Sequence, residues 1–369
     1  MTSLDAADYA DRPPIPTRQL GATGIAVPAV GIGCWAIGGP DDNLGMPMGW
    51  STGGDEARSL AGLETAWQHG ARLYDTADVY GHGRSERLLG RLVDQVPRHE
   101  IVLASKVGYF AGTAVHGFEP RHMRRQLEQS LDNLQTDHLD IYAFHHPNFG
   151  TDDRWLHPAL DAMRTFRDEG LIRAIGMRGP HRFAVDRLTT PPDQRGDKIS
   201  RFRALFDTVQ PGILAVRDNL LTPSHRSEGV FSFADKHNVG ILISKPLSQG
   251  LLTGTYRADI QREFGDGDHR LRKHWFQPDA IGIINAGLDR VRALVGPHTE
   301  DLIRVALWGC LDRSPNAVAL VGFTTPSHVA MNLGSLCPRP DAAEIAAARE
   351  IMARVQARLD AAGETILVT

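Results

Sequence analysis

The segment Leu73-Tyr74-Asp75-Thr76-Ala77-Asp78-Val79-Tyr80-Gly81-His82-Gly83-Arg84-Ser85-Glu86 decides the fold of this chain. An apolar run ends in the carboxylate Asp75, and the phenol Tyr80 follows five residues later in a polar, glycine-flanked stretch. A helix is predicted to start at Ser85. A strand, a polar loop and a helix in this order are how α/β enzymes place reactive groups at a rigid edge.

The same alternation repeats along the rest of the chain. Eight short β-rich runs are predicted, at residues 31–35, 72–75, 101–105, 139–144, 171–177, 213–217, 240–244 and 317–322. Helices are predicted at residues 55–70, 85–94, 120–134, 155–168, 180–188, 229–237, 279–294, 299–311, 327–334 and 342–359. Residues 38–54, 189–198 and 247–275 are read as loops or insertions.

This pattern favours one closed sheet. Parallel strands need crossover connections, here the helices, and eight such units in one domain are typical of an α/β fold of the (β/α)8 TIM-barrel type. An N-terminal β-hairpin is expected before the barrel and extra C-terminal helices after it. An open doubly wound sheet is the competing fold, but no GxGxxG turn follows the first strand. Residues 1–14 are expected to be a flexible N-terminal tail, and residues 15–369 a single barrel domain.

The composition argues against several partners. The 369 residues carry a net charge of −4, which gives no electrostatic reason to bind nucleic acid or an anionic membrane. Cys34, Cys310 and Cys337 form no CxxC pair, as is typical of a reducing cytoplasm. With no leader peptide and no membrane-spanning run predicted, we expect a soluble cytoplasmic protein. None of the 16 histidines belongs to an HExxH or other ligand-spaced set, so no metal is predicted.

Four ionisable residues fall at or just beyond successive predicted strand ends. Asp75 and Tyr80 follow the second strand, Lys106 the third and His145 the fourth. In a barrel the strand ends meet at one mouth, so these four side chains are expected to share a pocket. Carbonyl reduction suits them, because a hydride adding to carbon leaves negative charge on oxygen and a proton donor must meet it.

Each residue has a proposed role and an alternative without chemistry. The phenol Tyr80 would donate the proton, Lys106 would lower its pKa, Asp75 would hold Lys106, and His145 would orient the carbonyl or relay the proton. Taken singly, Asp75 and Lys106 could equally form a structural ion pair, Tyr80 could serve packing, and His145 could be structural. The agreement of all four with one chemistry favours the catalytic interpretation.

These four positions resemble the Asp, Tyr, Lys and His tetrad of the aldo-keto reductase superfamily. The resemblance runs from Arg18 to about Gly334, and its spacing is similar to the branch of bacterial oxidoreductases and potassium-channel β subunits. Further matching segments are Arg18-Gln19-Leu20-Gly21, Ala104-Ser105-Lys106-Val107-Gly108, Asp140-Ile141-Tyr142 and Pro246-Leu247-Ser248-Gln249-Gly250-Leu251-Leu252-Thr253-Gly254.

The resemblance implies NADPH as cofactor, with NADH still open, held extended across the barrel mouth. The implied cofactor-binding residues are Cys34, Trp35, Asp75, Arg178, Ser244, Lys245, Pro246, Leu247, Gln249, Gly250, Leu251, Gly322, Thr324, Thr325, His328 and Asn332. The implied substrate contacts are Trp35, Tyr80, His145, Tyr109 and Arg178. The segment that begins at Gly322 is a strand end followed by a helix N-terminus, which suits a phosphate.

Several positions near the expected nicotinamide depart from the family pattern. Arg178-Gly179 stands where Ser-Asn usually grips the carboxamide. Ala215 replaces the usual Gln facing the ring, unless Gln210 takes that place, and Ser244 replaces a stacking aromatic. The basic residue often found near the 2′-phosphate is replaced by Thr324 or His328, depending on the branch compared.

Arg178 leaves three interpretations open. It could bind the cofactor, anchor a carboxylate or phosphate of the substrate, or form a salt bridge with Asp218. The expected function is an NAD(P)H-dependent oxidoreductase that interconverts a carbonyl and an alcohol on a polar small molecule, such as a sugar or a secondary-metabolite intermediate. The alternatives are a cofactor-retaining epimerase and a non-catalytic NADPH-binding regulatory subunit. The oligomeric state stays open, a homo-oligomer included.

Overall fold

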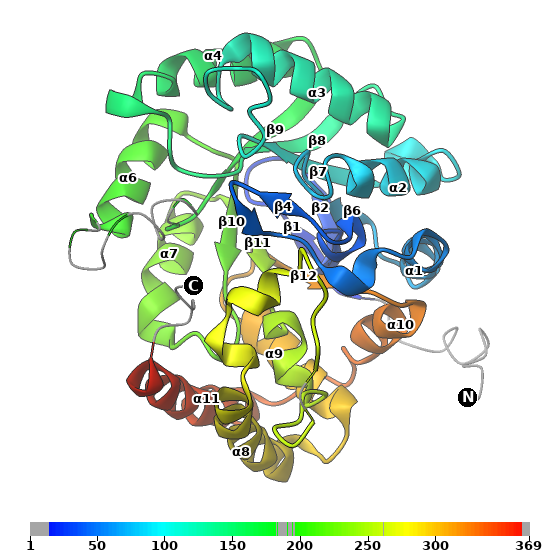
Figure 1. The fold of residues 1–369 in the computed structure, drawn as a ribbon, viewed down its shortest axis with the longest axis vertical. Coiled ribbons are helices and arrows are strands. Elements are labelled where there is room, and N and C mark those ends of the chain that lie inside the picture. The colour runs from blue at the N-terminus through cyan, green and yellow to red at the C-terminus, as the bar shows by residue number, and fades with distance from the viewer. Residues whose placement is uncertain are drawn as a thin grey trace.

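A computed structural model describes residues 15–363 of the chain, except residues 182, 184–189, 191–193, 195 and 261. The predicted tail at residues 1–14 lies outside this range, as does most of the predicted helix at 180–188. Eight parallel strands close into a barrel in the order β10-β11-β12-β3-β6-β7-β8-β9 (Figure 1). They are β3 (Val30–Gly33), β6 (Leu73–Asp75), β7 (Val102–Val107), β8 (Leu139–Phe144), β9 (Ile172–Arg178), β10 (Ile213–Arg217), β11 (Gly240–Ser244) and β12 (Ala317–Gly322). The predicted TIM barrel is confirmed.

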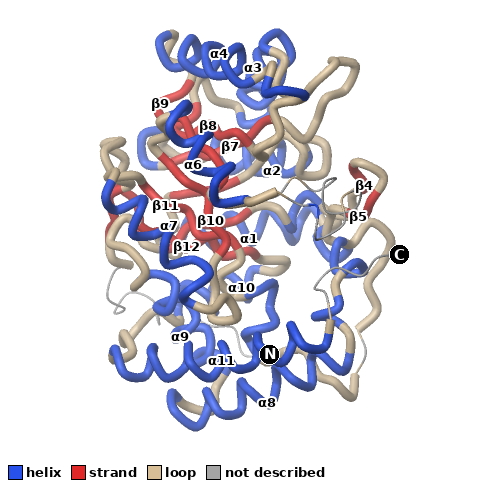
Figure 2. Tube along the Cα trace, turned by 90° about the vertical axis from the view of Figure 1, so that its left-hand side faces the viewer, coloured by secondary structure: helices blue, strands red, loops and turns tan. Residues whose placement is uncertain are grey.

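Helices surround the barrel (Figure 2). They are α1 (Glu56–Gln68), α2 (Arg84–Val93), α3 (Pro120–Leu134), α4 (Leu156–Asp168), α6 (Lys198–Val209), α7 (Ser224–Lys236), α8 (Pro278–Val295), α9 (Thr299–Leu311), α10 (Pro326–Gly334) and α11 (Ala342–Ala362). Helix α6 was not predicted, although Asp197 caps it by accepting hydrogen bonds from the backbone of Ile199 and Ser200. The proline- and glycine-rich sequence before it concealed its start.

The N-terminal hairpin closes one end of the barrel. Strands β1 (Thr17–Gln19) and β2 (Ala26–Pro28) pair antiparallel, as predicted. Their neighbours Leu20, Ile25 and Val27 are buried against side chains that point into the barrel from its strands, which are Leu73, Ala104, Ile141, Ala174, Ile213, Leu242, Val318 and Leu320. Gly21 bridges to Val239, just before β11 begins, so the hairpin covers the amino ends of the strands. The opposite mouth is left for the site.

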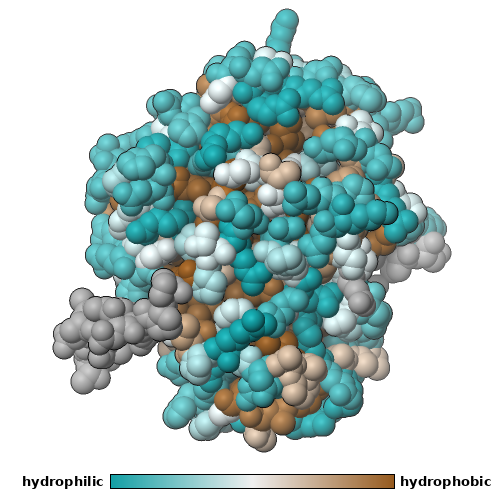
Figure 3. Space-filling model, turned by 180° about the vertical axis from the view of Figure 1, so that it is seen from behind, coloured by the Kyte–Doolittle hydropathy of each residue, from teal (hydrophilic) through white to brown (hydrophobic). Residues whose placement is uncertain are grey.

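Two long connections cover that opposite mouth. A second small hairpin, β4 (Asp42–Asn43) with β5 (Met46–Pro47), occurs where only a loop was predicted. The connection after β11 folds into short 3₁₀ helices at Ser248–Thr253, His269–Arg272 and His274–Phe276. Seen from behind, hydrophobic residues at the surface lie in small groups among hydrophilic ones (Figure 3). Across the described ranges no helix is long and apolar enough to cross a membrane.

Candidate active site

Three neighbouring strands carry three of the four residues predicted to react. Asp75 ends β6, Lys106 is the penultimate residue of β7, and His145 follows β8 directly. Because β6, β7 and β8 are adjacent, their carboxyl ends lie on one side of the mouth. Lys106 Nζ donates hydrogen bonds to Asp75 Oδ2 at 2.8 Å and to the carbonyl oxygen of Thr76 at 2.5 Å. The ion pair is buried, with 4% of the Lys106 side chain and 10% of the Asp75 side chain exposed.

The loop after β6 brings Tyr80 to this ion pair. Gly81 has a φ of 60°, and a Cβ there would lie 2.1 Å from the carbonyl oxygen of Gly38, so this turn requires glycine. The Lys106 ammonium lies 5.0 Å from the centroid of the Tyr80 ring. The His145 ring meets the Tyr80 ring edge-on, with 5.7 Å between centroids. The structure thus brings together the four residues that the sequence placed at separate strand ends.

Burial controls the protonation of Tyr80. Burial raises the pKa of the phenol, Lys106 lowers it, Asp75 raises it and Arg178 lowers it, and the resulting pKa is above the ordinary value. The expectation that Lys106 lowers the pKa of Tyr80 therefore has the correct sign for that pair but is wrong for the net shift, because the hydroxyl also loses its water. At neutral pH the phenol is protonated and can donate.

His145 is a neutral imidazole. Burial, followed by the charges of Lys106 and Arg178, holds its pKa well below the ordinary value. Its Nδ1 atom is buried and has no hydrogen-bond partner in the part of the chain that the structure describes. Its ring also meets the Tyr109 ring edge-on at 4.8 Å between centroids. A neutral imidazole can donate one hydrogen bond to an oxygen atom held beside Tyr80.

A cavity of about 1020 Å³ opens at the carboxyl ends of the strands. This volume is at the upper end of what small-molecule sites usually offer, and it leaves room for a dinucleotide together with a substrate. The predicted residues that line it are Trp35, Asp75, Tyr80, Tyr109, His145, Arg178, Ser244, Lys245, Pro246, Leu247, Gln249, Gly250, Gly322, Thr324, His328 and Asn332.

Three predicted cofactor residues do not line the cavity. The side chains of Cys34 and Leu251 are buried in the core, so neither presents a side chain to a ligand. Thr325 instead caps α10, where its Oγ1 accepts from the backbone N–H of His328 at 3.3 Å. A sequence motif does not reveal which way a side chain points. Lys106 also lies outside the lining, and its side chain is buried in the ion pair with Asp75.

The turn between β12 and α10 provides an environment suited to a phosphate. The first residues of α10 offer backbone N–H groups at the positive end of a helix dipole. Thr324 and His328 lie together there, with 3.2 Å between Oγ1 and Nδ1, and both line the cavity. Arg262, from the connection after β11, also lines the cavity and is close enough to lower the pKa of His328, after the larger effect of burial. The sequence did not point to Arg262, because it lies in the long predicted loop at residues 247–275, far along the chain from the start of α10 at Pro326.

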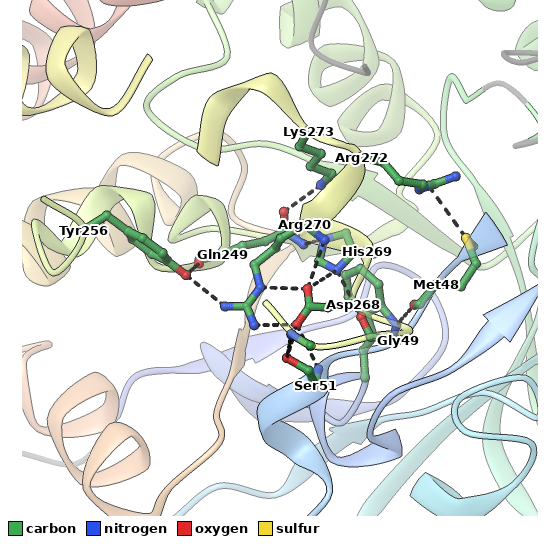
Figure 4. Close-up of polar contacts among 12 residues, drawn as sticks. Met48, Gly49, Ser51, Gln249, Tyr256, Asp268, His269, Arg270, Arg272 and Lys273 are labelled. Atoms are coloured by element: carbon green, nitrogen blue, oxygen red, sulfur yellow. Dashed lines mark hydrogen bonds and ion pairs between the residues drawn. The ribbon is translucent and has the colours of Figure 1, made fainter. Parts of the chain in front are cut away.

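A cluster of polar residues joins two distant loops beside the cavity (Figure 4). Asp268 Oδ2 accepts hydrogen bonds from Ser51 N and Ser51 Oγ, both at 2.8 Å, and from Arg270 Nη2 at 2.6 Å. His269 Nδ1 lies 3.2 Å from the carbonyl oxygen of Gly49. We call residues 48–51 and 268–270 the clasp. No short sequence motif marks it, because its halves are more than 200 residues apart.

Lys273 connects this cluster to the segment that begins at Pro246. Its Nζ donates to Gln249 Oε1 at 2.6 Å. Burial, followed by the charges of Lys245 and Arg217, lowers its pKa well below the ordinary value. Lys245 also lies over the Trp35 ring, 4.7 Å from its centroid. The wall formed by β10, β11 and their connections therefore carries several basic side chains, Arg217, Lys245 and Lys273.

The structure resolves two of the alternatives left open by the sequence. Asp218 binds Arg349 at 3.1 Å and Ser227 at 3.0 Å, so the proposed salt bridge between Asp218 and Arg178 is wrong. Gln210 precedes β10 and lies at the amino end of that strand, whereas Ala215 lines the cavity. The alignment with Ala215 facing the site is the one that the structure supports.

Among the residues described, no group of three or more His, Cys, Asp or Glu side chains is arranged to hold a metal ion. The fit to a nicotinamide dinucleotide rests on the cavity and on the α10 N-terminus at one part of it. At another part it rests on buried nitrogen atoms of His145 and Arg178 that have no hydrogen-bond partner among the described residues.

Comparisons with known proteins agree with this geometry. The chain is 26% identical over 329 residues to the NADH-specific methylglyoxal reductase of Escherichia coli, covering 86% of this chain and 92% of that protein. It is 27% identical over 270 residues to an NADP(+) aldo-keto reductase of Schizosaccharomyces pombe, covering 72% and 70%. The fold matches the glycerol dehydrogenase of Gluconobacter oxydans with a TM-score of 0.69, 24% identity and coverage of 92% and 95%.

The family assignment follows from these findings. The sequence model described as "Aldo/keto reductase family" matches residues 29–353, which is most of the chain. The protein is an NAD(P)-dependent oxidoreductase that acts on carbonyl and alcohol groups. The chain therefore belongs to the aldo/keto reductase family.

Proposed function

We propose that this protein reduces the carbonyl group of a polar small molecule to an alcohol, with Tyr80 as the general acid. The observation that carries the proposal is the position of Lys106, whose Nζ lies 2.8 Å from Asp75 Oδ2 and 5.0 Å from the Tyr80 ring centroid. One buried cation is thus shared by a carboxylate that fixes it and a phenol that it polarises.

Each residue has a distinct task in this proposal. The reduced nicotinamide supplies the hydride when it is bound. Tyr80 gives its proton to the carbonyl oxygen, and the Lys106 ammonium stabilises the negative charge that develops on the phenol. Asp75 keeps Lys106 in place, and neutral His145 donates a hydrogen bond that aligns the carbonyl oxygen. A sugar or a secondary-metabolite intermediate fits a cavity whose lining includes the charged side chains Arg178, Arg217 and Lys245.

The experiment that tests this proposal is Tyr80→Phe. The variant keeps the ring and its packing but removes the proton, so turnover should fall by about 10²- to 10⁴-fold. The dissociation constant for NADPH, measured by fluorescence titration, should stay nearly the same. Turnover equal to that of the wild type would contradict the role of Tyr80.

We propose NADPH rather than NADH as the preferred cofactor. Arg262, Thr324 and His328 line the cavity around the α10 N-terminus, where an additional phosphate would gain a guanidinium and backbone N–H groups. Titration with both nucleotides tests this preference. Arg262→Gln should weaken binding of NADPH and leave binding of NADH nearly unchanged.

A cofactor-retaining epimerase is the second candidate, and the clasp favours it. Both halves of the clasp contribute residues to the cavity lining, and hydrogen bonds of Asp268 join the two halves beside it. A dinucleotide held beneath these loops would leave slowly, as an oxidise-then-reduce cycle requires. Nucleotide that copurifies with the protein, together with substrate conversion that consumes no net NADPH, would support the epimerase over the reductase.

A further inference from the structure

Arg178 occupies an unusual place beside the reactive residues. It ends β9, and Met177 pairs with Phe144 of β8, so Arg178 and His145 follow in register on adjacent strands. Adjacent strands are about 4.8 Å apart, which puts the two residues side by side at the mouth. Both line the same cavity as Tyr80.

Among the described residues, no carboxylate pairs with the Arg178 guanidinium. No ion pair or side-chain hydrogen bond involves Arg178 within the described ranges, and its buried Nε has no partner. Asp75 at the same mouth is bound to Lys106, and Asp218, the partner considered from the sequence, is bound to Arg349 and Ser227. A buried donor without a partner is costly, so a ligand group that accepts its hydrogen bonds would be favoured.

The positive charge of Arg178 affects the pKa values of the reactive residues. Arg178 lowers the pKa values of Tyr80, Lys106 and His145, although burial has the larger effect on each. A group held by Arg178 would therefore share the cavity with a carbonyl group placed at Tyr80.

The neighbouring strand ends add to the positive charge. β10 ends in Arg217, and Lys245 follows β11, so three adjacent strands place a cation at the mouth. The carboxylates among the lining residues do little to neutralise this positive charge, because they are paired with other residues or exposed to solvent. Asp41 faces His82 at 3.0 Å, Asp75 binds Lys106, Asp360 binds Arg226 and Gln356, and Glu263 is exposed.

We propose that Arg178 binds the acidic group of an anionic carbonyl substrate, a carboxylate or a phosphate, and so aligns the carbonyl with Tyr80 and His145. The inference rests on the proposed reductase function. A planar guanidinium can hold either group through two parallel hydrogen bonds, which fixes orientation as well as position. The reaction stays balanced, because the carbonyl carbon takes the hydride of NADPH and its oxygen takes the Tyr80 proton, which solvent then restores.

Matched substrate pairs test this assignment. The first pair is 4-oxobutanoate and its methyl ester, and the second is glyceraldehyde 3-phosphate and glyceraldehyde. The wild-type enzyme should favour one anionic member by about 10- to 100-fold in kcat/KM, as expected for a charge-assisted hydrogen-bonded pair. The pair that shows the preference identifies the acidic group as a carboxylate or a phosphate.

Two substitutions on the same strand separate Arg178 from a general effect on β9. Arg178→Gln should remove most of the preference for the anion, whereas the NADPH dissociation constant should change by less than about threefold. Arg173→Gln is the matched control, because Arg173 pairs with Asp140 at the other end of β9 and should keep the preference. Equal losses for both members of a pair in Arg178→Gln, or a loss of NADPH affinity alone, would overturn the inference and assign Arg178 to the cofactor.

A binding measurement distinguishes this inference from the proposed function. Succinate, which cannot be reduced at an aldehyde, should quench the tryptophan fluorescence of the NADP⁺-loaded wild type but not of Arg178→Gln. Binding of succinate without reduction of any of the four carbonyl compounds would contradict the proposed function but support anion binding by Arg178. Equal reduction of charged and neutral substrates, without binding of succinate, would support the proposed function and contradict the role of Arg178.

Discussion

Replacing Lys106 with Met tests the electrostatic core of the site. Met has a similar length and no charge, so it fits the buried space but removes the cation between Asp75 and Tyr80. The carboxylate of Asp75 is then left buried without its partner. We expect turnover and stability both to fall, for related reasons.

The magnitude follows from the distances. Unit charges about 5 Å apart interact by about 3 kcal/mol at an effective dielectric constant of about 20. Losing that stabilisation of negative charge on Tyr80 corresponds to about a 10²-fold fall in kcat. The unpaired Asp75 charge raises the pKa of Tyr80 further, so a fall of about 10²- to 10⁴-fold is expected for the reaction. Breaking a buried ion pair should also lower the free energy of unfolding by about 3–5 kcal/mol.

The assay is single-turnover oxidation of NADPH across a pH series, together with denaturant unfolding. The double variant Asp75→Asn with Lys106→Met is the control, because it removes both charges and leaves neither unpaired. It should be more stable than Lys106→Met alone and remain slow in turnover. A folded Lys106→Met variant with kcat within about threefold of the wild type would refute the electrostatic reasoning.

Three further predictions concern protonation and the clasp. Burial and nearby cations keep the pKa of His145 well below its ordinary value, so kcat/KM should not change with titration of this imidazole between about pH 6 and 9. A pH dependence in this range that disappears in His145→Gln would contradict the prediction. Asp78 is buried without hydrogen-bond partners at its carboxyl oxygens among the residues described, and burial followed by Glu86 raises its pKa well above the ordinary value. The pKa of Asp78 is higher in the folded than in the unfolded protein, so its contribution to stability is greatest at acid pH and is lost as the pH rises. Asp78→Asn should therefore stabilise the protein by about 1–3 kcal/mol at neutral pH and by much less at acid pH. Thermal unfolding at the two pH values measures this difference. Asp268→Asn should weaken the clasp and speed NADPH dissociation in stopped-flow fluorescence, whereas the exposed control Asp266→Asn should not, and equal rates in both variants would refute a role for the clasp.

The tetrad could be predicted because each of its positions depends on local sequence. A strand end is a local property, since an apolar run stops where a polar or glycine residue follows it. Parallel strands in a closed barrel must then bring such ends to one mouth. The net pKa of Tyr80 could not be predicted in the same way, because it depends on how much water the surrounding packing removes.

The clasp and the paired state of Asp218 needed the tertiary structure. Ser51 and Asp268 are 217 positions apart, and no pattern in either segment identifies the other. Asp218 and Arg349 are separated by 131 positions, and nothing in the sequence relates them. Arg178, on the strand next to that of Asp218, was therefore considered as the partner of Asp218. Side-chain direction at Cys34 and Leu251 was likewise decided by packing.

The sequence by itself determined the barrel, its hairpin and the identity of four residues at its mouth, because apolar periodicity and strand ends are set by near neighbours. Only the tertiary structure decided that Arg178 lines the site with no carboxylate partner in the described part of the chain, that Arg262 comes to the α10 N-terminus, and that two loops are joined by Asp268. Those outcomes depend on charges and hydrogen bonds between distant segments, which meet only when the chain is folded.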